Sequence, residues 1–458
     1  MGFLDERYLL GSECAARLFD KVKDLPVMDV HNHADVAWIA DNRKFSDPWQ
    51  LFAATDHYVW EVMRKCDVPE ELITGTASAH DKWMALATIF PECVGNPVYE
   101  WIHLDLRRLG IDNVQLCAET GEQIWTECCR ILALDEFSPV SLIRKMNIET
   151  MCSTDDPLDL LEEHKRANQW FGRTVIRPTW RPDKAMNIYQ PTWRAYIEKL
   201  ATRFQKPINT FYDLVAVLEE SHAYFVEAGA IASDHGLEKP FSGDVSAEEV
   251  NTVFCKAMAG EKISSEEQNM FMSRLLLETA RMDAESGWVF QMHIGAVRDV
   301  RDCLFRNLGP DSGGDVSDHM IDIVKPLCRF LNHFDGSQLK VVLYCLEAGH
   351  QASLATVSRA FGSWVRLGSA WWLNDTPIGM RRQLEYIGSV DVYSRFAGMV
   401  SDSRKLLSYG SRFEMFRRIL CDVIANQVNA GQIPESCAAD LVVKMCYEGP
   451  KRFFNLNH

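Results

Sequence analysis

The feature that most constrains this sequence is a short, mostly apolar run that recurs along the chain and ends each time in polar or reactive residues. Parallel strands that helices cover on both faces have this continuous apolar pattern. Eight such runs, separated by segments of helical pattern, predict an α/β fold: a distorted (β/α)8, TIM-like barrel with reactive residues at the strand ends. The runs are residues 26–30, 148–152, 174–176, 229–232, 288–292, 340–346, 365–373 and 396–400.

The chain between the first two runs is too long for a simple crossover. It is typical of helices: Asp47-Pro48 resembles a helix start, and residues 119–132 are amphipathic. Because this segment leaves the carboxyl end of a strand, we expect a helical insertion near the barrel mouth. The expected parts are residues 1–34 with the first strand, 35–147 as the insertion, and 148–458 as the remainder of the barrel.

Two later segments also depart from a regular barrel. Residues 237–286 form a long excursion in which Ser246 and Ser264, each followed by acidic residues, have the pattern of helix N-caps. Residues 309–318, rich in Gly and Asp, are predicted to be a loop. Whether this loop closes over a ligand is left open.

Charge and cysteine content exclude several classes of function. The 458 residues carry 48 Lys and Arg against 64 Asp and Glu, a net charge of −16. This balance argues against binding nucleic acid or an anionic membrane. The 14 cysteines include no C-x-x-C pair, and no apolar run reaches the roughly 18 residues of a membrane helix. We therefore expect reduced thiols and a cytoplasmic chain.

Four residues at predicted strand ends have the chemistry of a metal site. His31 and His33 are two apart, so in a strand both imidazoles project to one side. His293 and Asp402 end the fifth and eighth runs, and together the four could bind one divalent ion with a position open for substrate or water. Taken singly, His293 could instead be a core histidine, and Asp402 could cap the helix expected at 413–420.

These residues resemble the amidohydrolase superfamily, and within it most closely the uronate isomerases. The resemblance extends in order over nearly the whole chain. After Ala296 the sequence departs from the asparagine-rich pattern of that family, and near His350 the match is loose. The matching segments are Asp29–His33, Asp56–Arg64, Cys152–Pro157, Arg177–Lys184, Ser233–Gly236, Gln291–Ala296, Trp371–Asp375 and Ser401–Arg404.

The resemblance implies an aldose–ketose isomerase that interconverts D-glucuronate with D-fructuronate and D-galacturonate with D-tagaturonate. A proton moves from C2 to C1 through an enediol, which requires a base, a polarised carbonyl and a shuttle between two oxygens. Asp402 is the expected base, acting directly or through a metal-bound hydroxyl. His57 and Tyr58 are the expected shuttle from the insertion, and Arg404 completes the expected catalytic residues.

Substrate binding is assigned to arginines and tryptophans. Arg181 and Arg404, with Arg298 as a weaker candidate, would hold anionic oxygens, and Trp371 or Trp372 would exclude water. Each has a structural alternative. Arg181 could be a surface turn residue paired with Asp183, Arg404 a first-turn helix residue, Tyr58 a packing residue, and the two tryptophans core. His235, expected to face the mouth, is predicted to be structural or to support the site, whereas Asp155 and Asp156 could simply cap a helix.

The number of metal ions separates the isomerase from its nearest rival. Two-metal hydrolases of the superfamily need a bridging lysine on strand four and a histidine on strand six, and neither is present at 228–234 or 344–347. One ion, most simply Zn²⁺ given three imidazoles and one carboxylate, is therefore expected. A single-metal hydrolase and a non-catalytic sugar-acid-binding barrel are the alternatives. The expected partner is a small hexuronate, with no nucleic acid and no membrane, and a homo-oligomer is left open.

Overall fold

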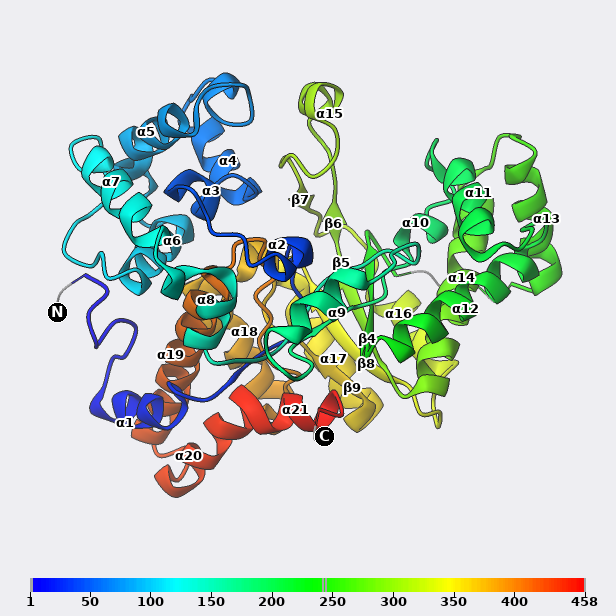
Figure 1. The fold of residues 1–458 in the computed structure, drawn as a ribbon. Coiled ribbons are helices and arrows are strands. Elements are labelled where there is room, and N and C mark those ends of the chain that lie inside the picture. The colour runs from blue at the N-terminus through cyan, green and yellow to red at the C-terminus, as the bar shows by residue number, and fades with distance from the viewer. Residues whose placement is uncertain (1–2, 241–242, 244, 457–458) are drawn as a thin grey trace.

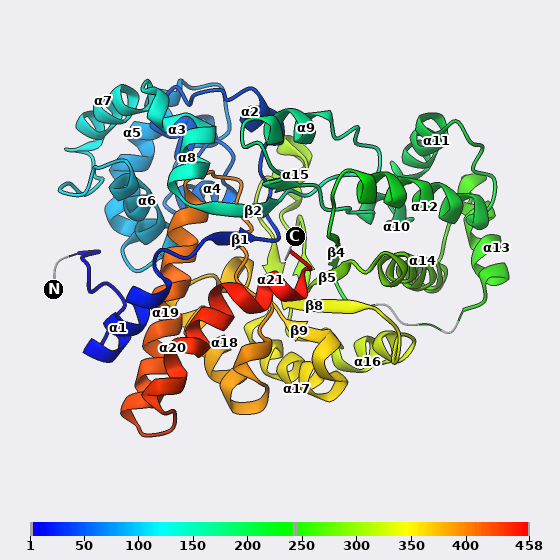
Figure 2. The ribbon, with the colours of Figure 1, turned by 60° about the horizontal axis from the view of Figure 1, so that its bottom comes forward.

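The computed structural model describes residues 3–240, 243 and 245–456. Two parallel sheets lie at the centre of an α/β molecule, with helices around them (Figures 1 and 2). The first sheet has the order β1 (Val27–Asp29), β2 (Ile148–Cys152) and β3 (Ile176–Arg177). The second has the order β4 (Ala232–Leu237), β5 (Val289–Ile294), β8 (Lys340–Cys345) and β9 (Val365–Leu367).

Short contacts connect the two sheets on both sides. On one side an isolated parallel bridge pairs Trp180, beyond β3, with Ser233 of β4. On the other side the segment 396–400 contacts β9, where the Ala397 amide donates to the Leu367 carbonyl at 2.8 Å. Just beyond it, the Asp402 amide donates to the His31 carbonyl at 3.2 Å.

The eighth predicted strand, at 396–400, is wrong, because this segment forms no strand. Gly398 has a φ of +114°, outside the extended region, and a Cβ there would lie 2.7 Å from the Pro450 ring. The Ser401 amide that follows donates to the Asp29 side chain at 2.9 Å rather than to a ladder carbonyl. The chain therefore passes beside β1 without pairing regularly with it.

Two further strand limits differ from the prediction. The fourth run was expected to end at residue 232, but β4 continues to Leu237 in register with β5. The seventh was expected to reach residue 373, but β9 ends at Leu367. A Cβ on Gly368 would overlap the Tyr344 ring, and Trp371 and Trp372 have φ angles of +62° and +31°, so the strand cannot continue.

The described chain between β1 and β2 is helical and contains no strand, as the sequence predicts. Asp47 caps α3 by accepting from the Gln50 amide at 2.9 Å, which confirms the predicted helix start. In Figure 1 these helices, blue to cyan, lie together on one side of the sheets. They are α2 (Val36–Ala40), α3 (Pro48–Phe52), α4 (His57–Lys65), α5 (Ala79–Ile89), α6 (Pro97–Arg108), α7 (Gly121–Leu132) and α8 (Pro139–Lys145).

The excursion after β4 consists of two helices, α13 (Ala247–Met258) and α14 (Ser265–Ser286). Ser246 and Ser264 form capping boxes with Glu249 and Glu267, which confirms both predicted N-caps. The predicted loop at 309–318 is only partly a loop. Val316–Ser317 forms β7, which pairs antiparallel with β6 (Ala296–Val297) in a hairpin that also carries α15 (Asp302–Leu308).

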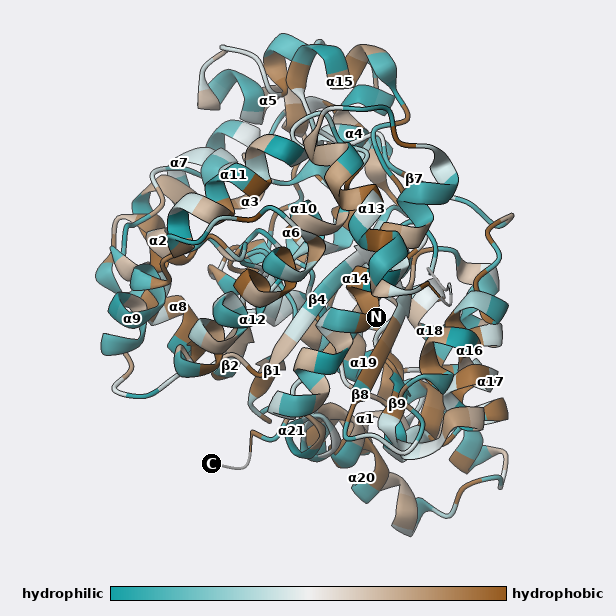
Figure 3. Ribbon diagram, turned by 90° about the vertical axis from the view of Figure 1, so that its right-hand side faces the viewer, coloured by the Kyte–Doolittle hydropathy of each residue, from teal (hydrophilic) through white to brown (hydrophobic). Residues whose placement is uncertain are grey.

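The remaining helices pack around the strands and bury a continuous apolar core. Strand β8 is brown in Figure 3, whereas the peripheral helices carry much teal. Among the described helices, none has the length and apolar character to cross a membrane. The remaining helices are α1 (Glu13–Val22), α9 (Glu162–Gln169), α10 (Asp183–Met186), α11 (Trp193–Phe204), α12 (Phe211–Glu227), α16 (Val324–Asn332), α17 (Gln351–Phe361), α18 (Pro377–Val390), α19 (Ser408–Asn429), α20 (Glu435–Val443) and α21 (Gly449–Phe453).

Candidate active site

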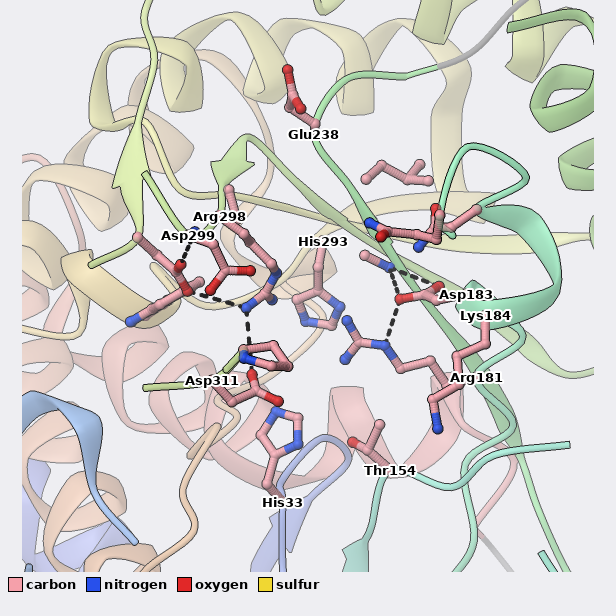
Figure 4. Close-up of a pocket in the computed structure, with 18 of the residues that line it drawn as sticks. His33, Thr154, Arg181, Asp183, Lys184, Glu238, His293, Arg298, Asp299 and Asp311 are labelled. Carbon is pink, nitrogen blue, oxygen red and sulfur yellow. Dashed lines mark hydrogen bonds and ion pairs between the residues drawn. The ribbon is translucent and has the colours of Figure 1, made fainter. Parts of the chain in front are cut away.

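A cavity of about 1180 Å³ lies where the carboxyl ends of the central strands meet the insertion and the hairpin. Figure 4 shows His33 and His293 inside it, with Arg298 and Asp311 on one side and Arg181 and Asp183 on the other. Of the predicted site residues, all but Tyr58 line the cavity. Those that do are His31, His33, His57, Arg181, His293, Arg298, Trp371, Trp372, Asp402 and Arg404.

Asp402 lies between the two histidines at the end of β1. The Nε2 atoms of His31 and His33 are each 3.1 Å from Asp402 Oδ1. Asp402 has a left-handed φ of +49°. It does not cap α19, whose N-cap is Leu407, so the helix-cap alternative is wrong. The predicted convergence of the first and last parts of the chain is therefore present.

The electrostatics of this trio favour an ionised carboxylate. Burial alone would raise the pKa of Asp402, but contacts with His31 and His33 hold it well below its usual value. Burial lowers the pKa of His33. Burial also opposes the charged form of His31, but the carboxylates of Asp234 and Asp402 outweigh it and raise the pKa of His31. Asp402 is thus a carboxylate near neutral pH.

His293 is oriented by Asp234, a residue that the sequence analysis did not assign to the site. His293 Nδ1 lies 2.6 Å from Asp234 Oδ1, and both side chains are buried. Burial and the nearby His31 lower the pKa of His293 to about 4, so its imidazole is neutral. The contact with Asp234 places the proton on Nδ1 and leaves the Nε2 lone pair free.

The four predicted metal ligands do not form one compact group. His31, His33 and Asp402 form one set of donor atoms within 4.8 Å of one another, while His31, Asp234 and His293 form a second. The two sets meet at His31, whose ring centroid is 4.1 Å from that of His293. His293 Nε2 is buried and has no hydrogen-bond partner in the described chain. A buried acceptor of this kind beside an ionised carboxylate fits a divalent cation.

Strand β4 places Asp234 and His235 on opposite faces. The sequence analysis considered strand four, at 228–234, only for a bridging lysine and gave Asp234 no role. In the actual strand, side chains alternate: Asp234 points toward the histidines, whereas His235 points away. The prediction that His235 faces the mouth is therefore wrong. Its Nε2 lies 2.9 Å from Ser233 Oγ and its ring stacks on Phe290, which supports the structural interpretation.

Arg181 is held at the cavity wall by two carboxylates. Its Nε donates to Asp183 at 2.7 Å, and its Nη1 donates to Asp234 at 3.0 Å. The expected turn partner Asp183 is thus present, but Arg181 also belongs to the cavity. Burial would raise the pKa of Asp234, yet Arg181, His293 and His31 hold it well below its usual range. The Arg181 guanidinium is consequently largely neutralised by its own partners.

Arg298 and Arg404 share a carboxylate of the hairpin. Asp311 Oδ1 is 3.4 Å from Arg404 Nη2 and 3.9 Å from Arg298 Nη1, and Arg298 also contacts Asp315 at 3.2 Å. Arg404 lies outside every helix, so the first-turn alternative is wrong. Burial would raise the pKa of Asp311, but Arg404 and Arg298 lower it overall. An acidic group therefore already lies between the two arginines, and the sequence analysis had not identified it.

His57 and Tyr58 begin α4 but differ in exposure to the cavity. The His57 ring is 5.5 Å from the Trp372 ring, and burial lowers the pKa of His57. Tyr58 is behind it, edge-on to Trp101 and under the Arg412 guanidinium, so the packing alternative describes its ring. Its hydroxyl is buried and has no hydrogen-bond partner among the described residues.

Trp371 and Trp372 form one wall of the cavity. The Trp371 ring is 4.7 Å from His293, and the Arg298 guanidinium lies 5.2 Å from the Trp372 ring centre. Both side chains are also almost fully buried, so the core and wall interpretations apply together. Asp375 fixes their turn by accepting from the Trp371 amide at 3.0 Å.

Asp155 and Asp156 line the cavity and bind backbone amides. Asp155 accepts from the Thr179 amide at 3.1 Å, and Asp156 accepts from the Leu158 amide at 3.0 Å. Neither precedes a helix, so the capping prediction is wrong in detail although amide binding is present. Both stabilise the turn after β2.

Comparison with known proteins agrees with this geometry. Residues 1–454 match the family model described as glucuronate isomerase. The chain belongs to the glucuronate isomerase family. A uronate isomerase of Thermotoga petrophila is 48% identical over 453 residues, 99% of each chain. The crystal structure of the Thermotoga maritima uronate isomerase, 47% identical, superposes with a TM-score of 0.97 over 99% of this chain and 100% of that one.

A more distant relative in the glucuronate isomerase family has the same fold. The crystal structure of the Caulobacter crescentus glucuronate isomerase superposes with a TM-score of 0.94 at 25% identity, covering 100% of this chain and 98% of that one. The similarity thus extends over the insertion, the hairpin and the carboxyl-terminal helices as well as the strands.

Proposed function

We infer that this chain is a uronate isomerase that interconverts D-glucuronate with D-fructuronate and D-galacturonate with D-tagaturonate. The observation that carries this inference is the ionised Asp402 beside two histidines in a cavity lined by Arg181, Arg298 and Arg404, within a chain that matches the family over residues 1–454. A hexuronate has a carboxylate at one end and a carbonyl at the other, and this cavity offers both a base and cationic groups.

His31, His33, His293 and Asp402 are the residues that would hold one divalent ion, which we propose to be Zn²⁺. Three imidazoles and one carboxylate suit zinc better than magnesium. When bound, the ion supplies positive charge that polarises substrate oxygens. Asp234 is less suited to hold a second ion, because Arg181 and His293 already engage its two oxygens at 3.0 and 2.6 Å.

Asp402 is the proposed base that removes the proton from C2. Its low pKa keeps it unprotonated near neutral pH, so it is ready to accept a proton. The Asp402 backbone is left-handed, and its carboxylate lies against His31 and His33. Returning the proton to C1 completes the isomerisation.

Arg298 and Arg404 are proposed to bind the substrate carboxylate. Both line the cavity, and both contact a carboxylate, that of Asp311. Arg181 already has two carboxylate partners, so we propose that it contacts neutral hydroxyls instead. Trp371 and Trp372 would exclude water from the reacting carbons.

His57, with Tyr58 behind it, is proposed to move the proton between O1 and O2 of the enediol. His57 lines the cavity, and its lowered pKa keeps the imidazole neutral, so one ring nitrogen can donate while the other accepts. The buried Tyr58 hydroxyl, which does not line the cavity, has no hydrogen-bond partner among the described residues and would support His57 from behind.

We also propose a closed, distorted (β/α)8 barrel in which the irregular segment 396–402 takes the place of the eighth strand, with residues 35–147 as a helical domain. The bridge at Trp180–Ser233 and the contacts of 396–402 with β9 and β1 support it.

Incubation with D-glucuronate in D₂O tests the function. Proton NMR should show D-fructuronate forming with zinc present, and deuterium appearing at the carbon that gains the proton to the extent that the transferred proton exchanges with solvent. D-galacturonate should give D-tagaturonate in a parallel reaction. If neither hexuronate is converted by the metal-loaded protein, the assignment is wrong.

A further inference from the structure

Outside the cavity, one buried ion pair connects the two segments that carry the proposed reacting groups. Lys405 Nζ lies 2.7 Å from Asp56 Oδ2, and the two side chains are only 2% and 6% exposed. Asp56 directly precedes His57 and Tyr58, whereas Lys405 directly follows Arg404 and is three residues after Asp402. Neither charged atom has a hydrogen-bond partner elsewhere in the described chain.

We propose that Asp56 and Lys405 are positioning residues that set the placement of His57 and Tyr58 relative to Asp402. This inference rests on the proposed function and adds to it a part of the protein that does not touch substrate. Neither residue lines the cavity, although Asp56 begins one of the segments that resemble the family.

Asp56 and Lys405 each make a further hydrogen bond within their own segment. Asp56 is the N-cap of α4, and its Oδ1 accepts from the Tyr58 amide at 2.9 Å while its Oδ2 faces Lys405. One carboxylate therefore binds both the start of the helix and the ammonium group. The Lys405 amide donates to Ser403 Oγ at 3.1 Å, so the turn that carries Asp402 is fixed to the same lysine.

Both partners of this contact carry a charge in a buried environment. Burial would raise the pKa of Asp56, but Lys405, aided by His57, lowers it overall, so the carboxylate is ionised. A buried ion pair in low dielectric resists separation, because moving the partners apart leaves each charge without solvent. Backbone bonds hold the turn at 401–405 to β1, since the His33 amide donates to the Ser403 carbonyl at 3.1 Å. The ion pair adds the connection to α4.

The placement of His57 and Tyr58 relative to Asp402 should affect the rate of turnover more than it affects substrate binding. A shift of about 1 Å in a reacting group can reduce turnover on the order of 100-fold. Arg181, Arg298 and the histidines of the proposed metal site are on other segments, and only Arg404 shares the turn of Lys405. Loss of the pair should therefore affect binding less than turnover.

Three variants test the inference. Lys405→Met removes the ammonium group, Asp56→Asn keeps a capping oxygen but removes the charge, and the double variant removes both charges without leaving either unpaired. Arg418→Met is the matched control, because Arg418 is also buried and paired, with Glu414 at 3.0 Å, but lies outside the cavity. Turnover is measured per folded molecule, well below each melting temperature, with hydrogen exchange measured in parallel.

We expect both single variants and the double variant to lose turnover on the order of 100-fold with KM changed less than about threefold. Amide exchange should rise at residues 57–60 and 401–405 and not elsewhere, and Arg418→Met should show neither effect. Turnover within about twofold of native in the folded variants, or recovery in the double variant, would mean that the pair is only structural and would overturn the inference.

The two proposals fail in different ways. If the native protein converts no hexuronate, the proposed function is wrong, and the exchange experiment alone decides the positioning role. Unchanged exchange at residues 57–60 and 401–405 in both single variants would refute that role whatever the activity.

Discussion

Asp402 owes its ionised state to two opposing effects on one carboxylate. Burial favours the protonated form, whereas His31 and His33, each 3.1 Å from Oδ1, favour the ionised form and prevail. A base that is ionised yet shielded from bulk water is suited to removing a proton from carbon.

Asp402→Asn tests this role with little change in shape. We expect kcat to fall on the order of 10²–10⁴-fold, because the amide cannot accept the proton. Steady-state kinetics with D-glucuronate measure the loss, and circular dichroism verifies the fold. A folded variant with near-native kcat would exclude Asp402 as the base.

The buried carboxyl group of Asp375, which accepts from the Trp371 amide, predicts how the stability of the protein depends on pH. Burial, opposed by Arg412 at 3.8 Å, raises the pKa of Asp375 to about 8, above its usual value of 3.8. Between about pH 4 and 8, Asp375 is therefore protonated in the folded state and ionised in the unfolded state. This contribution to stability is complete below about pH 4 and is lost as the pH rises through 8.

Urea unfolding between pH 4 and 8 measures this effect. As the pH rises from 4 to 8, the free energy of unfolding of the native chain should fall relative to that of Asp375→Asn, because the amide carries no proton to lose. Asp440→Asn, at an exposed position of α20, is the control and should follow the native curve. Parallel curves for Asp375→Asn and the native chain would refute the raised pKa.

Sequence patterns predicted the chemistry of individual residues better than their surroundings. The H-x-H pair, His293 and Asp402 were each identified at a strand end, and the structure brings them together at one cavity. Asp311 was not identified, because its role depends on two arginines from distant segments. No local pattern marks a contact of that kind.

Among the elements, the hairpin of β6, α15 and β7 stands over the cavity and is fastened to α4 of the insertion. The Gly314 amide donates to Glu61 Oε1 at 2.7 Å, and Arg64 Nη1 donates to the Ser312 carbonyl at 2.6 Å. The hairpin in turn carries Asp311, which contacts Arg298 and Arg404.

Glu61→Ala should weaken the proposed carboxylate site without affecting the base. Freeing the hairpin adds an ordering cost to substrate binding, so KM for D-glucuronate should rise several-fold while kcat stays within about twofold. Glu71→Ala is the control, because Glu71 contacts Thr76 and not the hairpin. An unchanged KM would show that the hairpin does not contribute to binding.

Elements with strong local signals were predicted well. The capping serines of α13 and α14 and the start of α3 were correct, because caps depend on neighbouring residues. Strand limits were not, because β4 continues through polar residues that find buried partners in other strands and helices. The segment at 396–400 failed as a strand because of Gly398 and its contact with Pro450.

For the whole molecule, the site depends on contacts between remote parts of the chain. His31 and Asp402 are 371 residues apart, and His293 joins them from β5. The positions of these residues at predicted strand ends predicted this convergence, and the family resemblance agreed with it. The division of the donor atoms into two sets that share His31 could not be predicted from the sequence, because it depends on distances in the folded protein.

Titration of metal-free protein with Zn²⁺ tests most directly whether His31, His33, His293 and Asp402 together bind one cation. Bound metal and conversion of D-glucuronate are followed together as the ion is added. We predict that both reach a plateau at one ion per chain. A plateau at two ions, or full activity without any, would contradict the single-metal isomerase.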